Sequence, residues 1–225
     1  MAVATCLTLV LPETVRHAGP RPALRPRRPS VPAETRSVFV PAALAAFAGF
    51  AMFGLFTSVA PSFMAQTLGV HNLAVSGLVV FLTFASSTVG QASLGGVPAE
   101  RALPLGCFVL VAGLAAIGGS LLATSLPLLV AGAVVAGVGQ GLLFRAGLSA
   151  VSARAPADRR GETTSAFFVV AYLGISLPVV GVGALSLALG LRDAGLVFSA
   201  CAMVLAGSIG VWLLRAVPRR PRTGA

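Results

Sequence analysis

The chain alternates long apolar stretches with short polar breaks. Its two longest stretches without a formal charge are Val38–Ala99 and Ala102–Phe144. Because a bilayer has a hydrocarbon core about 30 Å thick, a helix needs about 20 apolar residues to cross it, so each stretch allows more than one crossing. In lipid, every backbone polar group must be bonded within the protein, which favours helices. The pattern therefore predicts an all-α integral membrane protein.

Proline and polar residues divide these stretches into six predicted spans. The dividing positions are Pro61, His71–Asn72, Pro98, Pro127, Ala155–Pro156 and Arg192–Asp193. The predicted spans are Val38–Ala60, Leu73–Leu94, Leu103–Ala123, Leu126–Val151, Thr164–Leu187 and Ala194–Leu214. We expect them to form one six-helix bundle over residues 38–215.

Arginines occupy every second connection between the predicted spans. If the spans alternate in direction, 14 of the 16 arginines fall on one side of the membrane: Arg16, Arg21, Arg25, Arg27, Arg28, Arg36, Arg101, Arg154, Arg159, Arg160, Arg215, Arg219, Arg220 and Arg222. The exceptions are Arg192, on the other side, and Arg145, inside the fourth span. Since arginines in short loops stay cytoplasmic, we expect a multi-pass cell-membrane protein with both termini inside the cell.

Composition narrows the possible functions. The chain is 56% hydrophobic and only 10% charged, which excludes an ordinary soluble domain. All basic residues are arginine, which points to a bacterial source with a GC-rich genome. The net charge of +10 does not indicate nucleic-acid binding, because the arginines flank spans and face lipid head groups. The cysteines and histidines show no metal-ligand spacing, so we expect no metal, no cofactor and no enzymatic activity.

The N-terminal region has a different character from the bundle. Ala2–Leu11 is an apolar run of 10 residues, about half of a crossing. It is a signal-peptide core, a short interfacial segment, or the end of a helix whose first half precedes Met1. The last interpretation fits best, because such a helix would lead directly into an Arg/Pro-rich linker. The expected organisation is a partial helix at 1–11, a cytoplasmic linker at 12–37, and a basic tail at 216–225.

Several segments resemble parts of a known transporter family. The LPET of Leu11–Thr14 is similar to the segments that often end helix six of major facilitator superfamily transporters. The loop APADRRGE, Ala155–Glu162, resembles their connection between helices ten and eleven. GISLPVVGVG, Gly174–Gly183, resembles the Gly- and Pro-rich antiporter pattern best known in helix five, whose symmetry mate is helix eleven. GGVPAERALPLG keeps Gly95, Glu100 and Arg101 of the family's loop motif but lacks its basic pair.

The resemblance implies the C-terminal six-helix half of a two-bundle carrier. Such a half would transport a small solute together with a complementary N-terminal half or through self-association. The Gly/Pro pattern slightly favours efflux of an amphipathic or drug-like compound. No Asp or Glu lies within the predicted spans, so if a proton is the coupling ion, we expect its carboxylate in the complementary half. The alternative is a truncated or mis-started, non-transporting fragment of such a carrier.

Arg145 is a candidate for the transport path because it is the one charge well inside a span. A central arginine costs about 2.5–3.5 kcal/mol on insertion scales, which makes such residues functional candidates. Arg145 lies about seven residues, or about 10 Å, from the predicted cytoplasmic edge, near enough for its side chain to snorkel. It either pairs with Glu162 or Asp158 or binds an anionic substrate group. Glu100 and Arg101 complete the expected ion-pairing residues on this side.

A polar stripe marks the second span. Thr83, Ser87 and Gln91 are four residues apart and therefore share one helical face. The stripe either bonds to a neighbouring helix or faces an aqueous cavity. Other residues could complete an amphipathic pocket wall, namely Gln140, Tyr172, Phe50, Phe53, Phe144, Phe167 and Phe168.

The fifth span carries the candidate gating residues Gly174, Pro178, Gly181 and Gly183. Proline removes a backbone donor and weakens the hydrogen bonding one turn earlier, which favours a bend. Gly181 and Gly183 relieve the crowding beyond it. The bend is either a static kink or a hinge used in alternating access.

Overall fold

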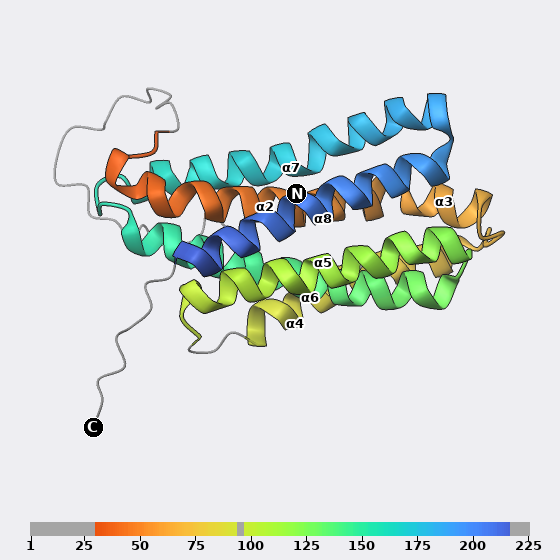
Figure 1. Cartoon of the computed structure of the whole chain (residues 1–225), viewed down its shortest axis with the longest axis horizontal. Helices are drawn as coiled ribbons and strands as arrows, with labels where there is room; N and C mark the ends of the chain where they lie inside the picture. The colour runs from red at the N-terminus through yellow and green to blue at the C-terminus, as the bar shows by residue number, and fades with distance from the viewer. Residues whose placement is uncertain (1–29, 94–96, 217–225) are drawn as a thin grey trace, which may run out of the picture.

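The computed structural model describes residues 30–93 and 97–216, which fold into a bundle of long helices without strands (Figure 1). In chain order the elements are η1 (Ala33–Thr35), α2 (Arg36–Ser58), α3 (Ala60–Gln66), α4 (Leu73–Ser93), α5 (Ala99–Ala123), α6 (Leu126–Arg154), α7 (Arg160–Leu189) and α8 (Leu191–Ala216). In this described part, six helical segments are long and apolar enough to cross a membrane. The prediction of an all-α bundle with six spans is confirmed.

The predicted spans match the helices to within four residues at every described end. The largest differences are at the starts of α5 and α7, which begin before Leu103 and Thr164. Their first turns contain Glu100 and Glu162, which the sequence pattern assigned to polar connections. An acidic side chain in a first turn is favourable because the helix N-terminus carries partial positive charge.

The first span continues past its predicted break. After α2 ends, a second short helix, α3, begins at Ala60 with Pro61 in its first turn. Proline is tolerated there because the missing N–H has no partner within the helix. At the other end, η1 and α2 begin inside the segment predicted to be linker, residues 12–37. The predicted partial helix at 1–11 and most of the basic tail lie outside the described residues.

Helix α6 packs closely between α5 and α4. Its glycines let the neighbouring backbones approach, as is common for membrane helices. On the α5 side, a Cβ added to Gly139 would lie 2.8 Å from Leu110 Cα, and one added to Gly113 of α5 would lie 2.5 Å from Ala136 Cα. These positions leave no room for a larger side chain. Helices α5 and α6 are therefore held at close range.

Helices α2 and α7 meet at a second glycine-mediated crossing. A Cβ added to Gly54 of α2 would lie 2.6 Å from the carbonyl oxygen of Ile175. One added to Gly174 of α7 would lie 2.6 Å from the carbonyl oxygen of Phe47. Beyond this crossing, the second half of α7 rises away from α2 (Figure 1).

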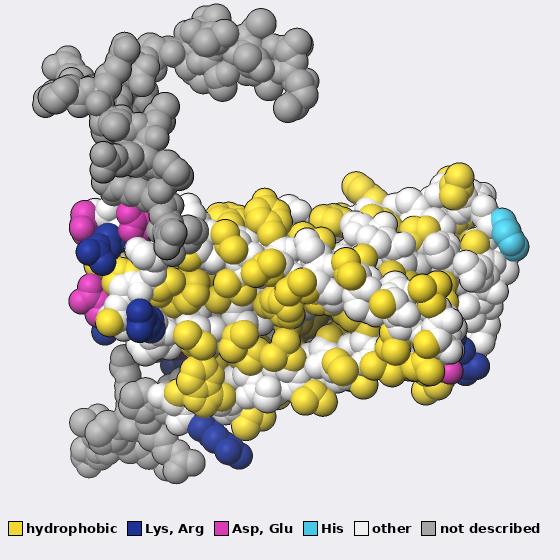
Figure 2. All heavy atoms as spheres, turned by 90° about the horizontal axis from the view of Figure 1, so that it is seen from above, with side chains coloured by type: hydrophobic (Ala, Val, Ile, Leu, Met, Phe, Trp, Pro, Cys, Tyr) yellow, Lys and Arg dark blue, Asp and Glu magenta, His cyan; other side chains and the backbone are white. Residues whose placement is uncertain are grey.

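Charged side chains gather at the two ends of the bundle. We call the end where α2, α5 and α7 begin and where α6 and α8 finish the arginine end, after its described arginines: Arg36, Arg101, Arg154, Arg159, Arg160 and Arg215. Arg192 and Asp193 begin α8 at the opposite end. The face shown in Figure 2 is largely apolar or uncharged between these ends. This distribution fits a bundle whose middle lies in lipid.

Candidate functional site

The polar stripe of α4 faces α6 in a regular register. Thr83, Ser87 and Gln91 lie opposite Gly137, Gly141 and Arg145, so that the residue numbers of each facing pair differ by 54. We call these six residues and Gln140 the polar seam. The two helices run in the same direction, and on each helix the contacting residues recur at every fourth position. Of the two interpretations of the stripe, the contacts support bonding to a neighbouring helix.

One buried hydrogen bond joins α4 to α6 in the polar seam, and two further bonds lie within α4. Ser87 Oγ donates to Gln140 Oε1 at 2.6 Å, and Gln91 Nε2 donates to Ser87 Oγ at 3.3 Å. Thr83 Oγ1 donates to the carbonyl of Val79 at 2.8 Å within α4. Gln140 is only 2% exposed, so it lies in the seam rather than on an open surface. These bonds satisfy polar groups that would otherwise be costly to bury.

The glycines of the polar seam allow the helices to touch through their backbones. Cβ atoms at Gly137 and Gly141 would collide with the carbonyl oxygens of Thr83 and Ser87. On α4, a Cβ at Gly90 would collide with the carbonyl oxygen of Val138. The seam is therefore a contact of main chains, supplemented by side-chain hydrogen bonds.

Arg145 completes the polar seam at the arginine end. Its Nη1 donates to the carbonyl oxygen of Gln91 at 2.8 Å. Gln91 is in the last turn of α4, where carbonyls lack intrahelical donors and the helix dipole favours a cation. The guanidinium is exposed and is held by α4.

The acidic residues expected near Arg145 have other contacts. Asp158 Oδ2 lies 4.0 Å from Arg159 Nε, and Glu162 accepts a hydrogen bond from Ser30 Oγ at 2.9 Å. Glu100 and Arg101 are exposed in the first turn of α5. The described contacts thus place Arg145 on a backbone carbonyl, while Asp158 and Glu162 lie in the connection to α7 and its first turn.

A continuous row of aromatic rings crosses α2, α4, α6 and α7. Starting from α4, the ring centroids of Phe84 and Phe53 are 4.3 Å apart, those of Phe53 and Phe50 are 5.9 Å apart, and those of Phe50 and Phe144 are 5.6 Å apart. From Phe144 the row continues to Phe168 at 5.9 Å, and Phe168 stacks on Tyr172 at 6.3 Å. We call the row, with the adjoining Phe167, the aromatic band.

The aromatic band has buried and exposed members. Phe167 is fully buried and Phe53 is 7% exposed, so these rings anchor the band in the bundle. Phe84 and Tyr172, at the two ends, are 43% and 60% exposed. The band lies near the middle of α4, α6 and α7, the depth at which transporter sites between bundles occur.

Phe84 was absent from the predicted pocket wall. The sequence offered one usable signal, since Phe84 directly follows Thr83 and therefore points about 100° away from the buried stripe around α4. Its stacking partner on α2 could not be inferred from spacing within one helix. The other predicted aromatic residues are brought together, whereas Gln140 lies apart from them in the polar seam.

The candidate gating residues of α7 lie in two environments. Gly174 is buried against α2, whereas Gly181 and Gly183 have open space where a Cβ would be. Pro178 lies between them inside one continuous helix. Because proline cannot bond to the carbonyl of Gly174, α7 has a weakened hydrogen bond where it leaves α2.

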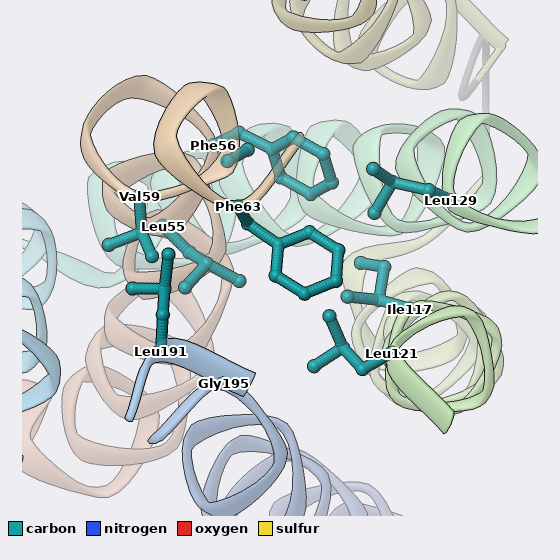
Figure 3. A pocket seen from close by; sticks show the side chains of 10 residues that line it. Leu55, Phe56, Val59, Phe63, Ile117, Leu121, Leu129, Leu191 and Gly195 are labelled. Carbon is teal, nitrogen blue, oxygen red and sulfur yellow. The ribbon is translucent and has the colours of Figure 1, made fainter. Parts of the chain in front are cut away.

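A small apolar cavity lies at the end of the bundle that is opposite the arginine end (Figure 3). Side chains from α2, α3, α5 and α6 point into it, including Phe56, Phe63, Ile117 and Leu129. Its volume is about 20 Å³, little more than the space of one water molecule. We interpret it as a packing defect beneath α3 and not as a solute site.

Comparison with known proteins identifies the family. A family model described as Major Facilitator Superfamily matches residues 1–179 of the 225-residue chain. A search of curated proteins found no match. The matched region includes the polar seam and the whole aromatic band. The chain, a multi-pass helical membrane protein, therefore belongs to the Major Facilitator Superfamily of transporters.

Proposed function

We propose that this six-helix bundle transports a small amphipathic solute by alternating access together with a second six-helix unit. The aromatic band would form this bundle's share of the wall of a central cavity. The main observation in support is a row of rings from four helices, near mid-depth, with exposed rings at both ends. Solute sites lined by aromatic groups bury apolar surface and orient the solute with few polar contacts.

The uneven burial of the helices supports a second unit on this face. Within the bundle, 28% of the apolar window of α4 and 17% of that of α7 are buried, against 72% for the segment containing α2. Both poorly buried helices carry exposed members of the aromatic band. A second unit packed along α4 and α7 would cover their exposed sides and enclose the band.

The arginine end is our proposed cytoplasmic side of a cell membrane. Among the described residues, six arginines lie at the arginine end and one, Arg192, lies at the opposite end. Arg145 lies between the two ends. Since short basic loops stay inside, α2 would enter from the cytoplasm and α8 would return to it. Both termini would then be cytoplasmic.

The exposed face formed by α4 and α7 suggests which solute is carried and where a coupling proton would bind. Rings and aliphatic groups predominate, with the Tyr172 hydroxyl as one polar group, so an amphipathic solute with an aromatic part fits best. The resemblance of the α7 glycine pattern to antiporters favours efflux. The described acidic residues lie in first turns or connections, so proton coupling would use a carboxylate of the second unit.

The experiment that tests this proposal is transport of a fluorescent amphipathic cation, ethidium, in inverted vesicles. The chain is present alone or together with an N-terminal six-helix unit from another family member. We expect ethidium uptake with the second unit, and a loss of roughly fivefold in Phe84→Ala, since a contact between two aromatic rings is worth about 0.5–1.5 kcal/mol beyond the area it buries. Phe108→Ala is the matched control because Phe108 is 40% exposed on α5, outside the aromatic band.

Two results would contradict the proposal. Equal loss in Phe84→Ala and Phe108→Ala, at equal protein levels, would show that the aromatic band has no special role. No transport of ethidium or of other amphipathic dyes in either composition would argue against this solute class.

A further inference from the structure

A hydrogen bond at the arginine end ties the segment before α2 to the start of α7. Ser30 Oγ donates to Glu162 Oε2 at 2.9 Å, across 132 positions of the chain. Ser30 is exposed and, with Val31 and Pro32, precedes η1 outside any helix. Glu162 lies in the first turn of α7. The bond therefore links the end of the predicted linker to the helix that carries the candidate gating residues.

Two arginines precede Ser30 in the sequence. Arg27 and Arg28 lie three and two positions before it. Protein kinases select their substrates partly by charge pattern, and a kinase with an acidic substrate groove binds arginines on the N-terminal side of the acceptor hydroxyl. The acceptor must also be exposed and outside a helix, as Ser30 is. Sequence and structure thus agree on an accessible hydroxyl in a basic context.

We propose that Ser30 is a phosphorylation site for a serine/threonine kinase that recognises arginines, and that the phosphate releases Ser30 from Glu162. The γ-phosphoryl group of ATP would pass to Ser30 Oγ. The new phosphorus–oxygen ester bond forms as the bond to the leaving ADP breaks, and the hydroxyl proton passes to a base of the kinase. In the cell, the reaction uses the proposed cytoplasmic position of the arginine end, where ATP is available.

Phosphorylation would replace an attraction by a repulsion. A phosphate carries a charge of about −1.5 to −2 near neutral pH, and beside a carboxylate it disrupts a contact by like-charge repulsion. The N-terminus of α7 attracts anions with only about half an elementary charge, less than the full charge of the Glu162 carboxylate. Arg36 offers the phosphate a new partner, because its Nε lies 3.4 Å from the carbonyl oxygen of Val31, next to Ser30.

Release of Ser30 would loosen the first turn of α7. That helix also contains Pro178, where its hydrogen bonding is weakened. Any effect of the phosphate on solute movement rests on the proposed transport function, whereas the modification and the release do not. Both can therefore be measured without a transport assay.

The first test is phosphorylation of the purified full chain in detergent by the catalytic subunit of cyclic-AMP-dependent protein kinase, with ATP. We expect phosphate at Ser30, located by fragmentation of peptides in a mass spectrometer. In Arg28→Gln the rate should fall roughly tenfold, which corresponds to about 1.4 kcal/mol. An unchanged rate in Arg28→Gln would overturn the proposal. So would phosphate confined to Thr223, which also follows arginines.

Thr163 is an internal control for the need for exposure. Arg159 and Arg160 precede it closely, but it is buried in α7, and its Oγ1 donates to the carbonyl of Arg159 at 3.0 Å. We expect no phosphate at Thr163 in the folded chain. Phosphate at Thr163 equal to that at Ser30 would show that arginines alone decide the reaction and would contradict the structural part of the argument.

Hydrogen exchange of the same sample measures the release from Glu162. The amides of Thr35 and Thr163 are bonded to the carbonyls of Pro32 and Arg159, at the starts of the two joined segments. Phosphorylation should speed their exchange roughly fivefold, or by about 1 kcal/mol. Unchanged exchange in the phosphorylated chain would overturn the release.

Glu162→Gln is the matched control for the repulsion. The glutamine amide is uncharged and can donate to a phosphate, so exchange should stay slow after phosphorylation of this variant. Equal acceleration in both proteins would contradict the proposed cause. A measurement on the wild-type chain covers the case in which the variant fails to fold. Treatment with alkaline phosphatase should restore slow exchange, and exchange that stays fast would overturn the proposal.

Discussion

The carbonyl oxygen of Gln91 accepts a hydrogen bond from Arg145 Nη1, 2.8 Å away on a helix two spans later. The bond joins the last turn of α4 to the half of α6 that is nearer the arginine end. It accounts for an arginine that is otherwise unexpected in a membrane helix, because the cation meets the negative end of the α4 dipole. It also ends the row of contacts that begins at Thr83.

Replacement of Arg145 should loosen the end of α4. We expect Arg145→Ala to lower the free energy of unfolding by about 1 kcal/mol, since an exposed hydrogen bond to a charged group and a dipole contact are lost. Thermal unfolding in detergent, followed by circular dichroism, measures the change. Arg159→Ala, an exposed arginine in the next connection, should change the midpoint far less. Equal effects of the two substitutions would argue against a specific role for Arg145.

The glycines of the polar seam should not tolerate a methyl group. Gly141→Ala places a Cβ against the carbonyl of Ser87, so we expect a loss of about 1–3 kcal/mol from overpacking. Gly181→Ala is the control, because open space surrounds Gly181 and alanine favours a helix by about 1 kcal/mol. The thermal unfolding midpoints of the two variants, measured in the same detergent, should shift in opposite directions from the wild-type midpoint. A stable Gly141→Ala variant would disprove the backbone contact.

The hydrogen bond between Ser87 and Gln140 should show measurable coupling. Ser87→Ala leaves the buried amide of Gln140 with fewer partners, at a cost of about 1–3 kcal/mol. In a double-mutant cycle with Gln140→Leu, we expect a coupling energy of about 0.6–1.7 kcal/mol, between the average and the maximum found for hydrogen bonds between membrane helices. Simple additivity of the two substitutions would indicate that the bond contributes little.

Cysteine labelling can test the orientation. In a chain whose native Cys6, Cys107 and Cys201 are replaced by alanine, Ala157→Cys lies at the arginine end and Ala188→Cys near the opposite end. In intact cells, a membrane-impermeant maleimide should label Ala188→Cys and leave Ala157→Cys unlabelled until the membrane is opened. The reverse pattern would place the arginine end outside.

Much of the fold could be predicted because lipid imposes a simple length and polarity rule. The helix boundaries followed from apolar runs and prolines, and the errors at Glu100 and Glu162 arose because first turns accept acidic residues. Pairings between helices were harder to predict. Thr83, Ser87 and Gln91 were recognised as one face, but their partners on α6 are glycines, which hydropathy does not distinguish from other small residues.

The candidate site was predicted only in part for the same reason. Periodicity shows which residues share one helix face, but it does not show which faces of different helices meet. Arg145 was expected either to pair with Glu162 or Asp158 or to bind an anionic substrate group, and its carbonyl partner carries no sequence signal. Phe84 was overlooked because the polar residues around it dominate the pattern of α4.

The four-residue repeat of the polar seam limits how α4 can move along α6. Gly137 and Gly141 of α6 each accommodate one main-chain carbonyl of α4, so a small axial slip would drive the carbonyl of Thr83 or Ser87 into the neighbouring side chains. The next matching register is four residues away, or about 6 Å. Helices α4 and α6 should therefore move as one unit, and a rearrangement within this bundle should involve the second half of α7, where open space surrounds Gly181 and Gly183.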